Sequence, residues 1–189
     1  MRTPRLAVTF SAFALVVAAA LMSAPTAGAD DGHRGDAKRV RILDDCDPAT
    51  FNEILGPEAC VGNGDTTFDE FVAEFMAQGS VDKWRFKPDV FHVDAGDSLD
   101  VVNKGGEFHT FTEVPDFGGG CIPFLNGDLP VNPLCEQGDA IFLATGVPPG
   151  AHLDVTGLSP GRPHKFQCLI HPWMHAVVTV RADDHRGHD

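Results

Sequence analysis

The densest group of metal-binding residue types lies near the C-terminus. Cys168, His171 and Met174 bring a thiol, an imidazole and a thioether within seven residues, between two strand-like segments. Soft sulfur ligands favour copper, and two imidazoles with one thiolate in a plane, plus a weak axial methionine, form an electron-transfer type of copper site. The second imidazole must come from elsewhere in the chain. We expect His109 to supply it, because this residue starts an apolar strand after a glycine turn.

The other histidines are weaker candidates for ligands. His175 adjoins Met174, and successive side chains of an extended segment point to opposite sides, so we expect His175 to face solvent. His164 shares the strand parity of Cys168, which would bring it near the site. The rest are expected in mobile tails, at the surface or as satisfied core residues: His33, His92, His152, His185 and His188.

Five cysteines are an odd number for a protein of an oxidising compartment. Cys46 and Cys60 lie close together, and Cys121 and Cys135 flank a loop rich in Gly, Pro and Asn. Proximity favours these two pairs as disulfides, although four cysteines allow three connectivities. This pairing leaves Cys168 as the free thiol.

The N-terminus predicts export. Arg2 and Arg5 precede an apolar run over residues 6–22, and the small residues at 27–29 suit cleavage before Asp30. The alternative is an uncleaved anchor, for which the run is slightly short. With no second long apolar run in the sequence, we expect a periplasmic or extracellular protein without stable membrane insertion after cleavage.

The net charge of the chain restricts the kinds of molecule that we expect it to bind. The formal charge is −13 at neutral pH, and the predicted leader carries two of the few arginines. Nucleic acid is excluded as a partner, because binding to phosphates requires clustered positive charge. An acidic surface maintains solubility and can also steer a basic redox partner.

The pattern of short apolar segments and turn residues along the chain predicts a mainly β fold. The capping-box pattern of Thr67 and Glu70 predicts a helix over 67–78, and a proline at the first position predicts a shorter one over 47–55. Beyond them, short segments rich in Val, Phe and Thr alternate with turn residues, as in a β-sandwich. The predicted strands cover residues 83–86, 90–93, 98–103, 108–113, 151–156, 161–168 and 176–181.

The ligand loop resembles that of the cupredoxins, or blue-copper proteins. The loop reads Cys168-x-x-His171-x-x-Met174, with His-Pro-aromatic-Met inside it, and this short spacing is similar to amicyanin. Relatives of plastocyanin and azurin also carry an upstream histidine after a turn, as His109 does here. The resemblance covers roughly residues 84–181 of the chain.

The resemblance implies a Greek-key sandwich with the ligand loop at one end and one type 1 copper. In it His109 and His171 supply equatorial nitrogens, Cys168 the equatorial thiolate and Met174 the axial thioether. Thr110 stands where many relatives have asparagine. The expected organisation is a signal peptide over 1–29, an N-terminal helical extension over 30–82, a cupredoxin domain with a disulfide-bearing loop insertion over 83–181, and a mobile tail over 182–189. Residues 30–38 are charged and lack apolar periodicity, so we expect the extension to begin with a second mobile tail.

A site with four protein ligands leaves no open position for a substrate, which favours an electron carrier over an enzyme. The partner would be a redox protein whose identity the sequence does not give. The alternative is a copper-binding or copper-buffering protein without redox turnover, which would use the same ligands. A multicopper oxidase needs paired His-x-His motifs, which the sequence lacks. Trp173 either forms an apolar rim at the edge of His171 or packs beneath the loop.

Overall fold

The structure, a computed structural model, describes residues 36–182. The predicted signal peptide, most of the C-terminal tail and the histidines His33, His185 and His188 lie outside these residues. Within residues 36–182, no helix is both long enough and apolar enough to cross a membrane.

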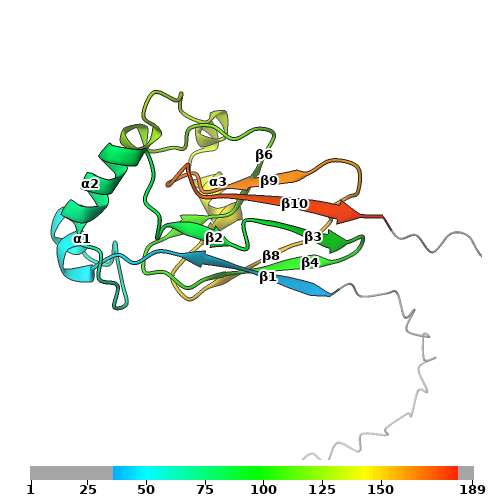
Figure 1. Cartoon of the computed structure of the whole chain (residues 1–189), viewed down its shortest axis with the longest axis horizontal. Helices are drawn as coiled ribbons and strands as arrows, with labels where there is room; N and C mark the ends of the chain where they lie inside the picture. The colour runs from blue at the N-terminus through cyan, green and yellow to red at the C-terminus, as the bar shows by residue number, and fades with distance from the viewer. Residues whose placement is uncertain (1–35, 183–189) are drawn as a thin grey trace, which may run out of the picture. The chain divides into compact units, whose positions relative to one another are not determined.

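Two four-stranded sheets form the body of the described chain (Figure 1). The first has the strand order β2-β1-β4-β8, and the second has the order β3-β10-β9-β6. Each sheet contains one parallel pair, β1 with β4 and β10 with β3. The first sheet comprises β1 (Ala37–Leu43), β2 (Arg85–Lys87), β4 (Ser98–Asn103) and β8 (His152–Val155). The second comprises β3 (Val90–Asp94), β6 (Thr112–Val114), β9 (His164–Gln167) and β10 (His175–Arg181), and a separate pair joins β5 (His109–Thr110) to β7 (Gly146–Val147).

The core forms between the sheets because strand residues alternate in burial. In β1, Val40 and Ile42 are buried while Arg39 and Arg41 are exposed. β10 repeats the pattern, and its buried residues belong to the same hydrophobic cluster as those of β1. The mainly β sandwich predicted from the sequence is therefore confirmed. Six of the seven predicted strands are present within a few residues of their expected bounds, whereas the strand predicted over 108–113 is divided into β5 and β6, which pair with different strands.

Both predicted helices are present. α1 (Pro48–Leu55) begins after Asp47, whose side chain accepts hydrogen bonds from two backbone amides of the first turn. α2 (Phe68–Gln78) has Thr67 as its N-cap with the full capping box, and Gly79 ends it in the left-handed conformation. Figure 1 shows both helices at the end of the sandwich where the loop between β9 and β10 lies.

An aromatic cluster attaches these helices to the sheets. Phe51 of α1 and Phe71 of α2 both pack on Trp84, with ring centroids 6.0 and 4.8 Å away. Trp84 and Phe51 are almost fully buried. The helices are thus part of the main core and form a layer over one end of the sandwich.

The segment over residues 30–82 differs from the expected extension in one respect. It contributes β1, which is paired on both sides, with β2 and with β4. A mobile tail was expected over residues 30–38, yet β1 already begins at Ala37. The predicted loop insertion is present and contains two 3-10 helices and α3, namely η1 (Pro123–Asn126), η2 (Pro133–Gln137) and α3 (Asp139–Thr145).

Candidate metal centre

Both predicted disulfides are present, and Cys168 is free. Cys46 is bonded to Cys60 and Cys121 to Cys135. Cys168 is a buried free thiol. The odd cysteine of the sequence is therefore available as a ligand.

The loop from β9 to β10 turns tightly around the expected ligands. The Cys168 N–H donates to the Met174 carbonyl at 3.1 Å, and the Met174 N–H donates to the His171 carbonyl at 2.9 Å. These two bonds close the loop at its base and fix the backbone of all three residues. His109 approaches from β5, whose short pairing with β7 holds it in place.

Three of the four predicted ligands converge. Cys168 Sγ lies 3.8 Å from His109 Nδ1 and 3.9 Å from His171 Nδ1, and the two Nδ1 atoms are 3.3 Å apart. His109 and Cys168 have no exposed surface, and His171 is 3% exposed. A metal in the plane of these atoms, with bonds of about 2.0 Å to nitrogen and about 2.3 Å to sulfur, would separate them by roughly 3.5 Å (N to N) and 3.7 Å (N to S). The three donors fit a trigonal metal site.

Met174 is buried at 1% exposure, next to the other three in the loop. The buried donor group itself is made by His109, Cys168 and His171. The axial role of Met174 therefore stays a prediction.

The sulfur of Cys168 is surrounded by donors. The backbone N–H groups of Thr110 and His171 both point at Sγ from 3.5 Å. Burial raises the pKa of the Cys168 thiol, but hydrogen bonds and charge interactions with His109 and His171 outweigh burial and place the pKa well below 9.0. The site thus favours a thiolate before any metal binds.

Thr110 connects the two halves of the site. Its hydroxyl accepts the Leu169 N–H at 2.8 Å, one residue after Cys168. Its own backbone N–H faces the thiolate. The residue that departs from the asparagine of many relatives therefore still links the His109 strand to the ligand loop.

The outer nitrogen of His109 meets a carboxylate. Asp44 Oδ2 lies 2.8 Å from His109 Nε2. Burial lowers the pKa of His109, but the hydrogen bond to Asp44 and the Cys168 thiolate outweigh burial and raise it to about 10. Burial alone would raise the pKa of Asp44. Interactions with His109 and with the surrounding backbone amides outweigh burial and bring the pKa below 3.8.

The outer nitrogen of His171 faces a second carboxylate at longer range. Glu107 Oε2 is 3.7 Å from His171 Nε2 and accepts a hydrogen bond from the Trp84 indole N–H. Burial raises the pKa of Glu107 above 4.5 despite the neighbouring histidines. Asp44, Glu107 and His109 could in principle form a metal group of their own. Their oxygens are already engaged by backbone and indole N–H groups, so the group with Cys168 is the better candidate.

Aromatic side chains of α2 cover His171. The Phe71 ring lies edge-on to the imidazole at 6.1 Å, and Trp173 contacts His171 at 5.4 Å. Trp173 also packs against Phe71 and Phe75. Trp173 therefore contacts the imidazole of His171 and the aromatic side chains of α2.

His175 does not face solvent as expected. Its ring stacks on Phe117 with centroids 3.8 Å apart, and burial lowers its pKa below 6.5. It does not belong to the ligand group. The prediction of exposure was wrong because the loop after β6 folds over the start of β10, which single-strand parity does not reveal.

The remaining described histidines are not ligands. His164 is buried and satisfied, with Nδ1 on Glu113 at 2.8 Å and Nε2 on the Ser159 carbonyl at 2.9 Å. His152 is exposed and pairs with Asp100 at 2.7 Å, and His92 is exposed.

The sequence did not predict that Asp44 and Glu107 lie at the site, because nothing in their local sequence indicates a partner. Only recognition of β1 would have brought Asp44 near the site.

Neither a protein-family model nor a curated protein matches the sequence. Among solved structures, the chain is similar to a purple cupredoxin from Nitrosopumilus maritimus, at 15% identity and a TM-score of 0.38, covering 76% of this chain and 99% of that one. It is also similar to a variant of amicyanin (14% identity, TM-score 0.36, 82% and 88% covered) and to a mutant plastocyanin of fern (16%, 0.35, 76% and 99%). We therefore assign the metal centre from the arrangement of this chain's own residues.

Proposed function

We propose that this protein is an exported mononuclear type 1 copper protein that carries single electrons between redox partners and is not an enzyme. The observation that carries the proposal is the buried group of His109, Cys168 and His171, with one sulfur and two Nδ1 atoms in trigonal arrangement. A soft thiolate with two imidazoles is the donor set that favours copper. Met174 would complete the set as a weak axial ligand.

The chain supplies rigidity and exclusion of water. A bound copper would supply a one-electron couple. His109 is held by β5, Cys168 and His171 by the closed loop, and Thr110 joins the two. Since all three donors are almost completely buried, a substrate would have little direct access to the metal. This favours electron carriage, because ligands that cannot move need little rearrangement when the metal changes charge.

Electrons would pass at the helical end of the molecule. A hollow of about 220 Å³ there reaches His171 and Glu107 and is lined mainly by apolar side chains, including Phe68, Ile122 and Phe124. The hollow brings the surface close to the His171 imidazole. The net charge of −13 suits a basic redox partner, which would be attracted at low ionic strength.

Titration of the purified mature protein with Cu(II) tests the proposal. We expect one equivalent to produce intense blue or purple thiolate-to-copper absorption, followed by a reversible one-electron wave in voltammetry. A colourless complex would contradict a type 1 site. A coloured complex without a reversible wave would contradict electron carriage and support copper buffering, which uses the same ligands.

Copper binding should release protons. The lowered pKa of Cys168 favours its thiolate form, whereas His109 with a pKa of about 10 still carries, at neutral pH, a proton on the nitrogen that the metal needs. We expect about one proton released per Cu(II), so that the apparent affinity rises roughly tenfold per pH unit up to about pH 10. Calorimetry in buffers of different ionisation enthalpy measures this number. An affinity that does not change between pH 7 and 9 would contradict it.

A further inference from the structure

A buried carboxylate from the N-terminal segment faces one metal-binding histidine. Asp44 Oδ2 lies 2.8 Å from His109 Nε2, and both side chains are 0% exposed. We propose that Asp44 is a positioning residue, which orients His109 for the metal and places a fixed negative charge that favours Cu(II) over Cu(I). This inference rests on the proposed copper site.

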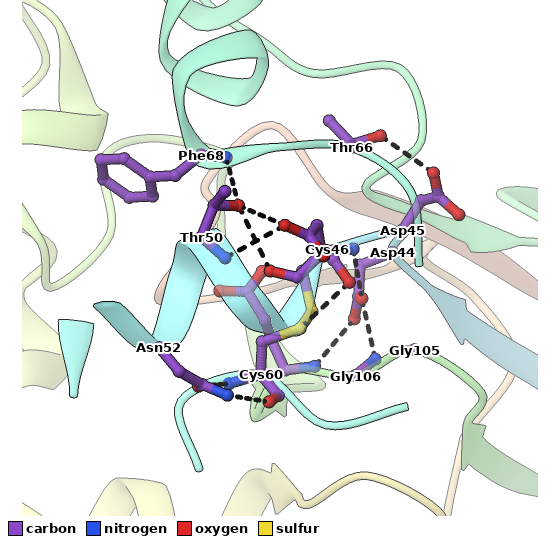
Figure 2. The surroundings of a disulfide bond; sticks show 12 residues. Asp44, Asp45, Cys46, Thr50, Asn52, Cys60, Thr66, Phe68, Gly105 and Gly106 are labelled. Atoms are coloured by element: carbon purple, nitrogen blue, oxygen red, sulfur yellow. Dashed lines mark hydrogen bonds between the residues drawn. A yellow bond between two sulfur atoms is a disulfide. The ribbon is translucent and has the colours of Figure 1, made fainter. Parts of the chain in front are cut away.

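The backbone around Asp44 is arranged to hold a carboxylate. Asp44 Oδ1 accepts the Gly106 N–H at 2.8 Å and, more weakly, the Cys46 N–H at 3.4 Å (Figure 2). Oδ2 accepts the Glu107 N–H at 3.2 Å. A carboxylate that accepts from several amides is stabilised in its charged form. Its two oxygens are therefore fixed independently of the metal.

The two glycines before His109 allow this approach. A Cβ atom at Gly105 would collide with the carboxylate of Asp44, and one at Gly106 would collide with the Val61 carbonyl and the Cys46 sulfur. Figure 2 shows the glycine turn against Asp44 and the disulfide. The glycine turn thus serves to bring the backbone of the His109 loop onto Asp44.

The hydrogen bond determines which nitrogen of His109 is available. Asp44 accepts a hydrogen bond from the Nε2–H of His109, so the proton that leaves on metal binding comes from Nδ1, the nitrogen that faces Cys168 Sγ. Outer carboxylates fix metal-binding histidines in this way and raise their basicity. His171 lacks an equally close partner, since Glu107 is 3.7 Å from its Nε2. Of these two histidines, only His109 is held by a direct carboxylate bond.

The negative charge of Asp44 should shift the equilibrium between Cu(II) and Cu(I). Cu(II) carries one more positive charge than Cu(I), so a nearby anion stabilises the oxidised state more. Solvent screening is weak because Asp44 and His109 are completely buried. Removal of the charge should therefore make the copper easier to reduce.

The test is Asp44→Asn, which preserves the shape and one acceptor oxygen but removes the charge. We expect the variant to bind copper with the same colour, while its preference for Cu(II) over Cu(I) falls about tenfold, a rise of about 59 mV in potential. Asp45→Asn is the matched control, because Asp45 loses the same charge from a partly exposed ion pair with Lys83. The redox potential of the Asp45→Asn variant should rise by less than half the rise expected for Asp44→Asn.

Equal shifts in the two coloured variants would overturn the role of Asp44 and leave the proposed function intact, whereas a colourless wild-type protein would overturn both. Circular dichroism of the apo-protein checks folding. If Asp44→Asn does not fold, Asp44→Ser is judged by the same criterion. In addition, the His109 Nε2 proton should exchange slowly in the Cu(I) wild-type protein by NMR and rapidly in Asp44→Ser; slow exchange in both would overturn the hydrogen bond's role.

Discussion

Replacement of Cys168 by serine is expected to remove all blue or purple absorption from the copper-loaded protein. The colour of a type 1 site arises from charge transfer between thiolate and Cu(II), and Cys168 is the free thiol among the described residues 36–182. Loss of a residue beside the ligands alone commonly weakens metal binding about 10- to 100-fold, so loss of the thiolate should weaken Cu(II) binding by more than about 100-fold. Absorption spectroscopy and competitive titration measure the two effects.

The matched control for Cys168→Ser is His175→Gln. His175 lies in the same segment, one residue after Met174, but stacks on Phe117 outside the donor group. The variant should keep its colour and its reversible wave. A coloured serine variant, or a colourless glutamine variant, would show that the ligand set is misassigned.

Loss of the Cys46–Cys60 disulfide is expected to lower the free energy of unfolding by about 3 kcal/mol. The bond closes a loop with a sequence separation of 14, and in the chain-entropy treatment a loop of this length contributes about that amount. The double variant Cys46→Ser/Cys60→Ser, unfolded by denaturant in the apo form, measures the effect. A change below about 1 kcal/mol would contradict the assignment of the bond as a stabilising cross-link.

The second disulfide offers a comparison of equal loop length. Cys121 and Cys135 are also 14 residues apart, so the corresponding serine pair should destabilise the protein by a similar amount. Cys46, however, contacts the glycine turn that holds Asp44, whereas Cys121 meets the ligand loop only through the Leu169 carbonyl. Only the first pair of substitutions should therefore shift the copper potential in the direction of Asp44→Asn.

The sequence predicted those parts of the fold that local pattern determines. Thr67 and Glu70 specify where α2 begins, and the strands from residue 85 onward follow their runs of Val, Phe and Thr. β1 was missed although Val40 and Ile42 alternate with arginines, because the neighbouring charged residues were interpreted as a tail. The alternation was a usable signal.

The sequence likewise predicted one part of the candidate site and not the other. The spacing of Cys168 and His171 in one loop was informative, and His109 followed from its turn and strand. The carboxylate of Asp44 could not be predicted, because its contact with His109 spans 65 residues and depends on the parallel pairing of β1 with β4. The stacking of His175 on Phe117 is likewise a long-range contact that the sequence of either segment does not indicate.

The order of the cysteines along the chain bears on how the thiol stays free. Both disulfides join near neighbours, and all four of their cysteines precede Cys168. A chain that reaches an oxidising compartment N-terminus first can close both short loops before its last cysteine arrives, since short loops close quickly. Cys168 then meets no reduced partner within its own chain. For a protein exported as proposed, vectorial delivery would thereby protect the thiol from mispairing until the last strand, β10, completes the site.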